Sequence, residues 1–492
     1  MARPLARGQP SAIRRAGHMI GRISLGLLAF GTTVMSFGLA IGIGARLEDR
    51  GVAGRETVLL RSASQAASSE APEATRGVSA TAPAPLDAGT SLQAFHAALR
   101  ELESGQRNKP VTVLHLGDSH VSGDRLDGHM RALLQSRFGD AGRGMLMPAG
   151  VLKGYRARGL RFETSGNWTG ANALETTTAV LGLTGVTASA TSAQSEMTVS
   201  MNEGRFDTVE VAFLAGPDKG AATISLDGRP HSVGTRSAEV GVQRARLPSG
   251  GVSLSVKPAG TGPITVLSWS LLKNRSGLRY VGLGLPGGGI DAVERLDELI
   301  LIDDLRALRP DLIILGYGSA EAIDDKLDAA QYRERFNGLV RLFKRLVPDA
   351  SIAIIGPPDI NRVPEFAARL RTSASTGCRA LSPEERQQHD ALVAAGDERL
   401  ARWYSPPRLA DVRQASQRSA VAHGAFYWDW SKVMGGECGM HAWATAKPEL
   451  ALPDHAMLTD EGYQRSARAL FGDLLQGYGA AEAPPNKQAA QR

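Results

Sequence analysis

Ser119 stands where the chain leaves a run of apolar and β-branched residues, a position from which a hydroxyl can do chemistry. Residues 111–116 read Val-Thr-Val-Leu-His-Leu and predict a buried strand. Gly117-Asp118 then predicts a tight turn, and the apolar spacing of residues 126–138 predicts an amphipathic helix. The carboxyl ends of strands form the edge at which open α/β sheets bind ligands. The serine at this edge is therefore a candidate nucleophile, and a serine that caps a helix is the alternative.

A nucleophilic serine needs a base that accepts its proton and a second group that orients the base. Near the C-terminus Asp454 and His455 stand side by side, and they supply a carboxylate and an imidazole. His120 and His441 are further candidates for the base, and each is also explained as a structural or solvated histidine. The residues alone leave open which histidine serves.

Four short stretches carry a family resemblance. They are Gly117-Asp118-Ser119-His120, Leu285-Pro286-Gly287, Gly318-Ser319-Ala320-Glu321, and Asp454 to Thr459 followed by Gly462-Tyr463. In this order they resemble the four blocks of the SGNH (GDSL-type) hydrolases, and they are most similar to the peptidoglycan O-acetylesterase-like branch of bacterial envelopes. The resemblance covers most of residues 91–476. It implies an α/β fold with a doubly wound parallel sheet.

The resemblance also implies a function and a set of roles. The function is that of a serine esterase that removes acetyl groups from an O-acetylated envelope polysaccharide, such as peptidoglycan, without a metal or another cofactor. Ser119 is then the nucleophile, Asp454 orients the base, and His455 is the nearest candidate for that base. The backbone N–H groups of Ser119 and Gly287 are then the donors that hold the oxyanion.

Two positions depart from the pattern of this family. Its third block has an asparagine whose side chain is a further oxyanion donor, and here Ala320 stands at that position. In the fourth block, Leu458-Thr459 sets the register and places Met457 where the family has its histidine. A thioether cannot accept a proton from serine. The alternative function is therefore that of a catalytically degenerate protein of the same fold, which binds carbohydrate or serves as a scaffold in the envelope.

Outside these stretches, strand and helix patterns alternate over residues 91–154 and 274–478, which predicts one α/β domain. Residues 155–273 instead show short alternations of period two between turn signals, which predict an inserted β-sandwich of the jelly-roll type. The resembling branch carries a carbohydrate-binding-like β-module at a similar place. Trp168 and Trp269 in this insert either belong to its core or stack on sugar rings.

The two ends of the chain differ from the rest in composition. Residues 1–22 are basic, residues 23–45 are uncharged and apolar, and residues 46–90 are rich in Ala, Ser and Pro. The apolar run exceeds the ~20 residues that span a bilayer, and its basic flank favours a cytoplasmic N-terminus. We therefore expect an uncleaved inner-membrane anchor, a disordered linker and a folded part in a bacterial periplasm; a cleaved signal peptide is the alternative. Residues 479–492 are predicted to be a disordered tail.

Composition argues against some classes of ligand, namely nucleic acids and zinc. The formal net charge is +6 and no basic stripe is interleaved with aromatic residues, so nucleic-acid binding is not expected. The sequence has no CxxC motif and no Cys/His spacing typical of a zinc site. Its two cysteines, Cys378 and Cys438, are able to pair if the chain is exported. The expected partners are an O-acetylated polysaccharide and the inner membrane.

Overall fold

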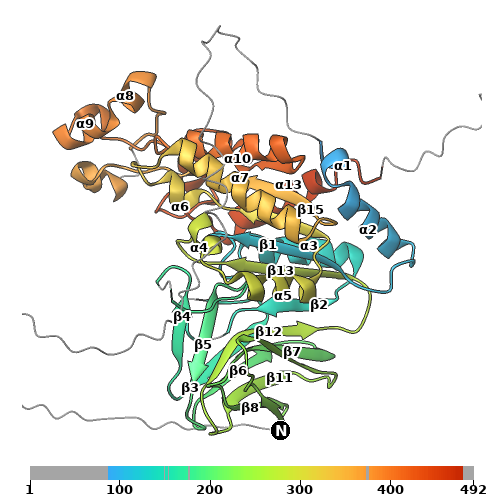
Figure 1. Ribbon diagram of the computed structural model, residues 1–492. Coiled ribbons are helices and arrows are strands. Elements are labelled where there is room, and N and C mark those ends of the chain that lie inside the picture. The colour runs from blue at the N-terminus through green and yellow to red at the C-terminus, as the bar shows by residue number, and fades with distance from the viewer. Residues whose placement is uncertain (1–86, 149, 153–154, 176–177, 373–375, 480–492) are drawn as a thin grey trace, which may run out of the picture. The chain divides into compact units, whose positions relative to one another are not determined.

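A parallel five-stranded sheet forms the centre of the α/β part of the chain in the computed structural model (Figure 1). The structure describes residues 87–148, 150–152, 155–175, 178–372 and 376–479. The strands, in the order in which they lie in the sheet, are β13 (Leu278–Gly284), β1 (Val111–Gly117), β14 (Leu312–Gly316), β15 (Ser351–Gly356) and β16 (Phe426–Asp429). The strand predicted before Ser119 is thus β1, and the predicted α/β architecture with a parallel sheet is confirmed.

The carboxyl end of β1 is a topological switch point, because β1 lies between the next two strands of this sheet along the chain. Gly117 at this end pairs with Gly284 of β13 on one side and with Gly316 of β14 on the other. The loops after three strands therefore emerge at one edge of the sheet. The backbones approach so closely that a Cβ on Gly284 would lie 2.4 Å from the backbone nitrogen of Ser122.

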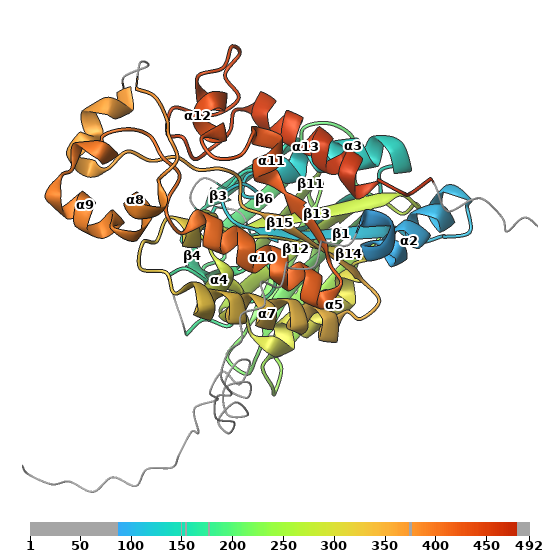
Figure 2. The ribbon, with the colours of Figure 1, turned by 90° about the horizontal axis from the view of Figure 1, so that it is seen from above.

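Helices cover both faces of the sheet, because the side chains of each strand alternate between the two faces. One face packs against α4 (Ile290–Glu294), α5 (Glu298–Leu308), α7 (Ala329–Leu346) and α10 (Leu409–His423). The other packs against α1 (Ala88–Ser91), α2 (Gln93–Glu103), α3 (Leu126–Phe138), α11 (Trp430–Met434), α12 (Gly439–Ala444) and α13 (Asp460–Leu474). Figure 2 shows α7 and α10 on one side of β1, and α3 and α13 on the other.

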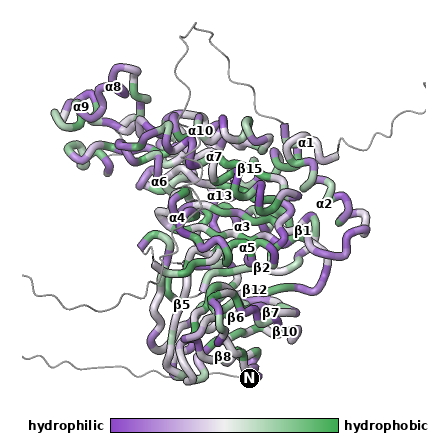
Figure 3. Tube along the Cα trace, viewed as in Figure 1, coloured by the Kyte–Doolittle hydropathy of each residue, from purple (hydrophilic) through white to green (hydrophobic). Residues whose placement is uncertain are grey.

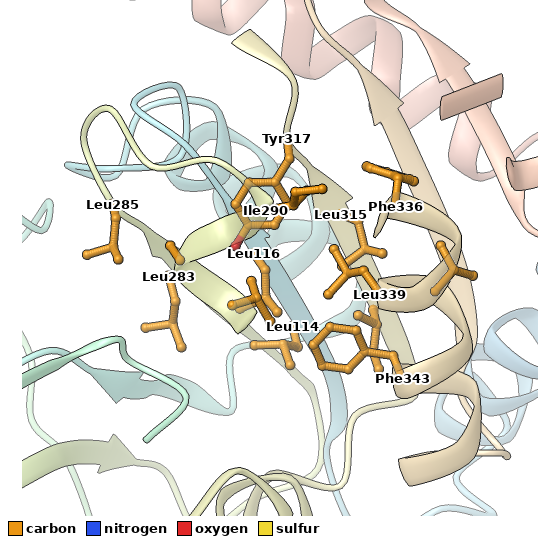
Figure 4. Packing of buried hydrophobic residues seen from close by; sticks show 14 of the residues in the cluster. Leu114, Leu116, Leu283, Leu285, Ile290, Leu315, Tyr317, Phe336, Leu339 and Phe343 are labelled. Carbon is orange, nitrogen blue, oxygen red and sulfur yellow. The ribbon is translucent and has the colours of Figure 1, made fainter. Parts of the chain in front are cut away.

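The first of these cores holds β1 in place from one side. Figure 4 shows Phe336, Leu339 and Phe343 of α7 packed in one cluster with Leu114 and Leu116 of β1. All five side chains are buried, and burying a side chain of this size contributes roughly 1.5–3 kcal/mol. Figure 3 shows hydrophobic residues gathered around β1 and β15. The strand that carries the candidate nucleophile is therefore part of a rigid core.

Two antiparallel sheets packed face to face form a β-sandwich, in agreement with the period-two pattern. One sheet has the order β10 (Gly241–Leu247), β7 (Thr208–Ala215), β12 (Ile264–Leu272), β5 (Val186–Ala190) and β4 (Thr169–Asn172), and β2 (Gly142–Leu146) also pairs with β12. The other has the order β3 (Leu160–Ser165), β6 (Glu196–Met201), β11 (Ser253–Pro258), β8 (Ala221–Leu226) and β9 (Arg229–Gly234). Val211 and Trp269 from the first sheet and Val199 and Leu254 from the second share one buried cluster.

The sandwich begins earlier in the chain than residue 155, because β2 joins it by pairing with β12. The structure decides between the two predicted alternatives for Trp269. Trp269 is fully buried, and its indole N–H donates a hydrogen bond of 2.9 Å to the carbonyl of Met147. Trp168 is half-buried and packs against the same core. Trp269 therefore belongs to the core of the module, whereas Trp168 contacts that core and keeps part of its surface exposed.

A lobe of short helices lies between β15 and α10 in the chain. It comprises η2 (Glu365–Thr372), α8 (Pro383–Gln387), α9 (His389–Ala395) and η3 (Glu398–Leu400). Cys378 of this lobe and Cys438, just before α12, form a disulfide whose Cα atoms lie 5.8 Å apart. The disulfide joins the lobe to the helix that carries His441.

The predicted membrane anchor at residues 23–45 and its basic flank lie outside the described residues, as do most of the predicted linker and the tail. In the part of the chain that is described, no helix combines the length and the apolar character that crossing a membrane requires. The described part of the chain starts at Asp87, whose side chain caps α1 by accepting a hydrogen bond of 2.9 Å from the N–H of Thr90. The last residues of the predicted linker therefore belong to the folded part.

Candidate active site

The turn after β1 presents Ser119 at the edge of the sheet, as predicted. The buried side-chain carboxylate of Asp118 accepts a hydrogen bond of 2.9 Å from the backbone N–H of His120. The backbone carbonyl of Asp118 accepts one of 3.0 Å from the N–H of Ser122. Ser119 itself is half-buried and lines an open cleft. The hydrogen bonds of Asp118 therefore fix the turn, and the serine hydroxyl remains accessible from the cleft.

Two backbone N–H groups at this edge are available to an oxyanion. Among the described residues, neither the N–H of Ser119 nor that of Gly287 donates a hydrogen bond. Gly287 follows β13, is exposed and has a φ of +79°, a conformation that favours glycine. A hydrogen bond of 3.2 Å from the N–H of Leu285 to the carbonyl of Gly117 ties this loop to the end of β1. The arrangement suits the predicted pair of oxyanion donors.

Met457 is the side chain that contacts the Ser119 hydroxyl, with 3.6 Å between the serine Oγ and the methionine Sδ. Asp454 shapes this loop, because its Oδ1 accepts hydrogen bonds of 2.9 Å from the N–H groups of Ala456 and Met457. Within the described residues, Asp454 therefore orients the backbone of residue 457 and hydrogen-bonds to no imidazole. Thr459 caps α13, because its side-chain oxygen accepts a hydrogen bond of 3.2 Å from the N–H of Gly462.

Among the described residues, His455 makes no hydrogen bond to Ser119, contrary to the role of base that the resemblance implies. Its Nδ1 lies 3.0 Å from the carbonyl of Pro453, and its Nε2 lies 3.1 Å from Nδ1 of His441. Its ring stacks on Trp403 with 3.6 Å between the ring centroids. The backbone conformation of the loop explains this placement. His455 has a φ of +54°, and its side chain packs on Trp403, whereas that of Met457 contacts Ser119.

The two stacked histidines are satisfied as neutral rings. Burial lowers the pKa of His441 and that of His455. In the tautomers that fit the contacts, His455 Nδ1–H donates to the Pro453 carbonyl and His455 Nε2 accepts from His441 Nδ1–H. The pair is therefore part of the packing of the loop, and His441 is no base for Ser119 either.

His120, the third candidate base, is a buried residue behind the nucleophile turn. Its Nδ1 lies 2.9 Å from the hydroxyl of Tyr463, and its ring meets Trp430 edge-on with 5.1 Å between centroids. Burial lowers the pKa of His120. In the described part of the chain, no histidine nitrogen hydrogen-bonds to the Ser119 hydroxyl.

The loop after β14 offers no replacement for the asparagine of the family's third block. Ala320 lies in α6 (Ser319–Ala322) and has no donor in its side chain. The neighbouring Ser319 Oγ is buried and lacks a hydrogen-bond partner among the described residues. It lines a cavity of about 10 Å³ beneath the turn with His115 and His120, separate from the cleft that holds Ser119. A cavity of this size holds about one water molecule.

The cleft that Ser119 lines has a volume of about 590 Å³ and a basic wall. Arg125, Arg156 and Arg158 contribute to this wall, and Asp460 is the acidic residue among those that line the cleft. These arginines lie in none of the four family-like stretches of the sequence. The sequence pattern that indicates two of them is the alternation Arg-Ala-Arg at residues 156–158. In the structure both arginines of this run are exposed and the alanine is buried.

A possible metal-binding group lies away from Ser119, in the lobe. Within the described residues, Asp325, His389 and Asp390 bring three ligand atoms close together. The guanidinium of Arg362 already occupies this position, with its Nη2 2.5 Å from Asp325 Oδ1 and 3.3 Å from His389 Nε2. The donor set is therefore satisfied by a cation of the chain itself and does not favour a metal ion.

The comparisons with known proteins support a fold. No family model and no curated protein matches the sequence. The structure is similar to that of a peptidoglycan O-acetylesterase, with 24% identity, a TM-score of 0.63 and coverage of 80% of this chain and 98% of that chain. A family two carbohydrate esterase from Cellvibrio japonicus (12% identity, 63% and 98% covered, TM-score 0.25) and a GDSL-like lipase from Bacteroides thetaiotaomicron (13% identity, 40% and 76% covered, TM-score 0.24) also match.

The chain therefore has the fold of the SGNH (GDSL-type) hydrolases. The likeness to the peptidoglycan O-acetylesterase spans both the α/β part and the β-sandwich, since 80% of this chain is covered. Ser119 lies after the first strand of the parallel sheet, Gly287 after β13 and Ala320 after β14, the positions to which the sequence blocks assign them.

Proposed function

We propose that the protein is a serine esterase that acts on an O-acetylated polysaccharide of the bacterial cell envelope, with peptidoglycan as one candidate substrate. The observation that carries the proposal is Ser119 at the edge of the sheet, open to a cleft. Among the described residues, its own backbone N–H and that of Gly287, in the loop tied to the end of β1, donate no hydrogen bond. The likeness in fold to a peptidoglycan O-acetylesterase supports the choice of substrate class.

In the proposed reaction, Ser119 Oγ attacks the carbonyl carbon of an acetyl ester. The N–H groups of Ser119 and Gly287 hold the oxyanion, the sugar hydroxyl leaves as the alcohol, and water then hydrolyses the acetyl-serine. The serine proton passes to water, because the Met457 thioether cannot accept it. Asp454 holds the loop of Met457 in place, and His455 has no part as a base in this proposal.

The proposal predicts a slow enzyme. A general base contributes about 10²–10⁴-fold to the rate, and one side-chain oxyanion donor contributes about 10²–10³-fold. The residual rate comes from the backbone donors and from binding of the ester.

A second candidate function is favoured by one observation, the contact between Met457 and the Ser119 hydroxyl. A methionine at this place fits a protein that keeps the cleft for binding acetylated carbohydrate and has lost turnover. Both candidates use the same cleft, so the dependence of turnover on Ser119 separates them.

Replacing Ser119 by alanine tests the esterase. We expect the full-length protein, purified in mild detergent, to hydrolyse 4-nitrophenyl acetate slowly, and Ser119→Ala to reduce this rate to that of buffer. Ser136→Ala is the matched control, since Ser136 is exposed on α3 and outside the cleft, and it should leave the rate unchanged. Equal rates of the wild-type protein and Ser119→Ala would leave binding without turnover as the function.

We also propose that residues 23–45 anchor the chain in the inner membrane and that the folded part lies in the periplasm. The basic flank at residues 1–22 and the disulfide between Cys378 and Cys438 support this location, because disulfides persist in oxidising compartments. Alkaline phosphatase fused after Arg492 should be active in cells, because that enzyme folds only outside the cytoplasm. Activity of a cytoplasmic reporter at the same position would contradict the proposed topology.

A further inference from the structure

Positive charge gathers on one wall of the cleft that holds Ser119. Three guanidinium groups line the cleft, and one of them, that of Arg158, forms an ion pair with Asp460. The Asp460 carboxylate also lies 3.1 Å from Nε2 of His129. Burial opposes ionisation of Asp460, and its hydrogen bonds to Arg158 and His129 outweigh that effect and keep its pKa below the usual value. The one acid of the cleft is therefore already engaged.

Arg125 and Arg156 have no carboxylate partner in the described part of the chain. Arg125 donates its Nε–H to the carbonyl of Ser122 at 3.2 Å, and its guanidinium lies 5.9 Å from the centre of the Tyr463 ring. This hydrogen bond and one to the Tyr463 hydroxyl use two of its five N–H donors. Arg156 is exposed and makes no hydrogen bond or ion pair with the described residues. Both side chains therefore have donors available to a ligand in the cleft.

We propose that Arg125 and Arg156 form a subsite for an anionic group that the polysaccharide carries close to the ester facing Ser119. The identity of the ester rests on the proposed function, whereas the anionic group is inferred from the arginines that line the cleft. The anion is a carboxylate or a phosphate, because a guanidinium binds either through two parallel N–H donors. The subsite selects acidic acetylated polysaccharides over neutral ones.

A buried cluster of charges holds the segment that carries Arg156. Asp124 accepts hydrogen bonds of 2.5 Å and 2.9 Å from the guanidinium groups of Arg131 and Arg143. The same carboxylate accepts a hydrogen bond of 2.6 Å from the backbone N–H of Arg158. Because a charged acceptor fixes the backbone two residues from Arg156, the segment that presents this arginine is held in place before the ligand arrives. Such preorganisation lowers the entropy lost on binding.

The charge of the cleft makes the selectivity testable by salt. A neutral polysaccharide leaves both guanidinium groups with water, whereas an acidic one pairs them with its own anion. Attraction between exposed charges is screened at high ionic strength, since the Debye length falls from about 10 Å at 0.1 M salt to about 3 Å at 1 M. Binding of the acidic polysaccharide should therefore weaken with salt, and binding of the neutral one should not.

The test compares equilibrium binding of the full-length protein to three polysaccharides acetylated to the same degree. They are polygalacturonate with carboxylates, phosphomannan with phosphates, and neutral mannan. We expect at least one acidic polymer to bind about tenfold or more tightly than mannan at low salt, and the tighter of the two identifies the anion. Equal binding of all three would overturn the proposal.

Variants assign the selectivity to the subsite. Arg156→Gln and Arg125→Gln should each reduce the preference for the acidic polymer about three- to tenfold. Arg229→Gln is the control, because Arg229 is an exposed arginine of β9 outside the cleft, and the preference should not change. An unchanged preference in both cleft variants would overturn the assignment. Binding is measured without turnover, so an arginine-dependent preference in a protein without Ser119-dependent hydrolysis would support the subsite and refute the esterase alone.

Discussion

Replacing Met457 by histidine together with Ala320 by asparagine should raise the rate of acetyl-ester hydrolysis by roughly 10²–10⁴-fold. The methionine sulfur lies 3.6 Å from the Ser119 hydroxyl, so an imidazole on the same backbone starts within reach of the serine proton. The asparagine would restore a third oxyanion donor in the loop after β14. The measurement is kcat/KM for 4-nitrophenyl acetate with the full-length protein.

Met457→Leu is the matched control for this gain, because leucine has nearly the volume of methionine and cannot accept a proton. We expect it to leave the rate close to that of the wild-type protein. A wild-type rate already comparable to that of the double variant would contradict the view that position 457 has lost the base. If the wild-type protein is very slow and the double variant is no faster, further side chains of the site must differ from those that catalysis requires.

Replacing Asp124 by alanine should lower the free energy of unfolding by about 3–5 kcal/mol, because it leaves two arginines buried without their carboxylate. Asp124 is 4% exposed and sits between Arg131 and Arg143. Burial by itself raises the pKa of Asp124, and the two guanidinium groups outweigh it and hold that pKa far below the usual value. Urea unfolding of both proteins measures the difference.

The pH dependence of this difference has a definite sign. A carboxyl whose pKa is lower in the folded state contributes its full stability above its unfolded pKa of about 3.9 and loses it as the pH falls further. The gap between the wild-type protein and Asp124→Ala should therefore be full at neutral pH and shrink below about pH 4. Glu163→Ala removes the exposed ion pair with Arg161 and should cost less than about 1 kcal/mol. Equal losses in the two variants would contradict a buried network at Asp124.

Much of the fold follows from local pattern. The apolar run before Gly117 predicts β1, and parallel pairing with β13 and β14 brings three loops to one edge. Leu458-Thr459 also predicts the register that places Met457 at the nucleophile, and the contact between the two side chains bears that register out. Spacing carries this information for the first three blocks because each follows a strand of the sheet, β1, β13 or β14. The fourth block instead precedes α13, and the cap that Thr459 forms on this helix fixes its register.

Other features of the site depend on geometry that spacing does not encode. His455 is two residues from Met457, and its positive φ turns the imidazole onto Trp403 and away from the serine. Arg156 reaches the cleft because a hydrogen bond from the following segment to Asp124 fixes its backbone. β2 is five residues long with two glycines, so only its pairing with β12 reveals its place in the sandwich.

The pH dependence of hydrolysis by Met457→His tests most directly whether residue 457 is the lost base. If it is, the variant should gain a rate that rises with pH through the pKa of the new histidine, near 6.5 when unperturbed, and that disappears with Ser119→Ala. The wild-type protein should show no such rise. A wild-type profile with the same rise, or a variant whose profile matches that of Met457→Leu, would contradict this account.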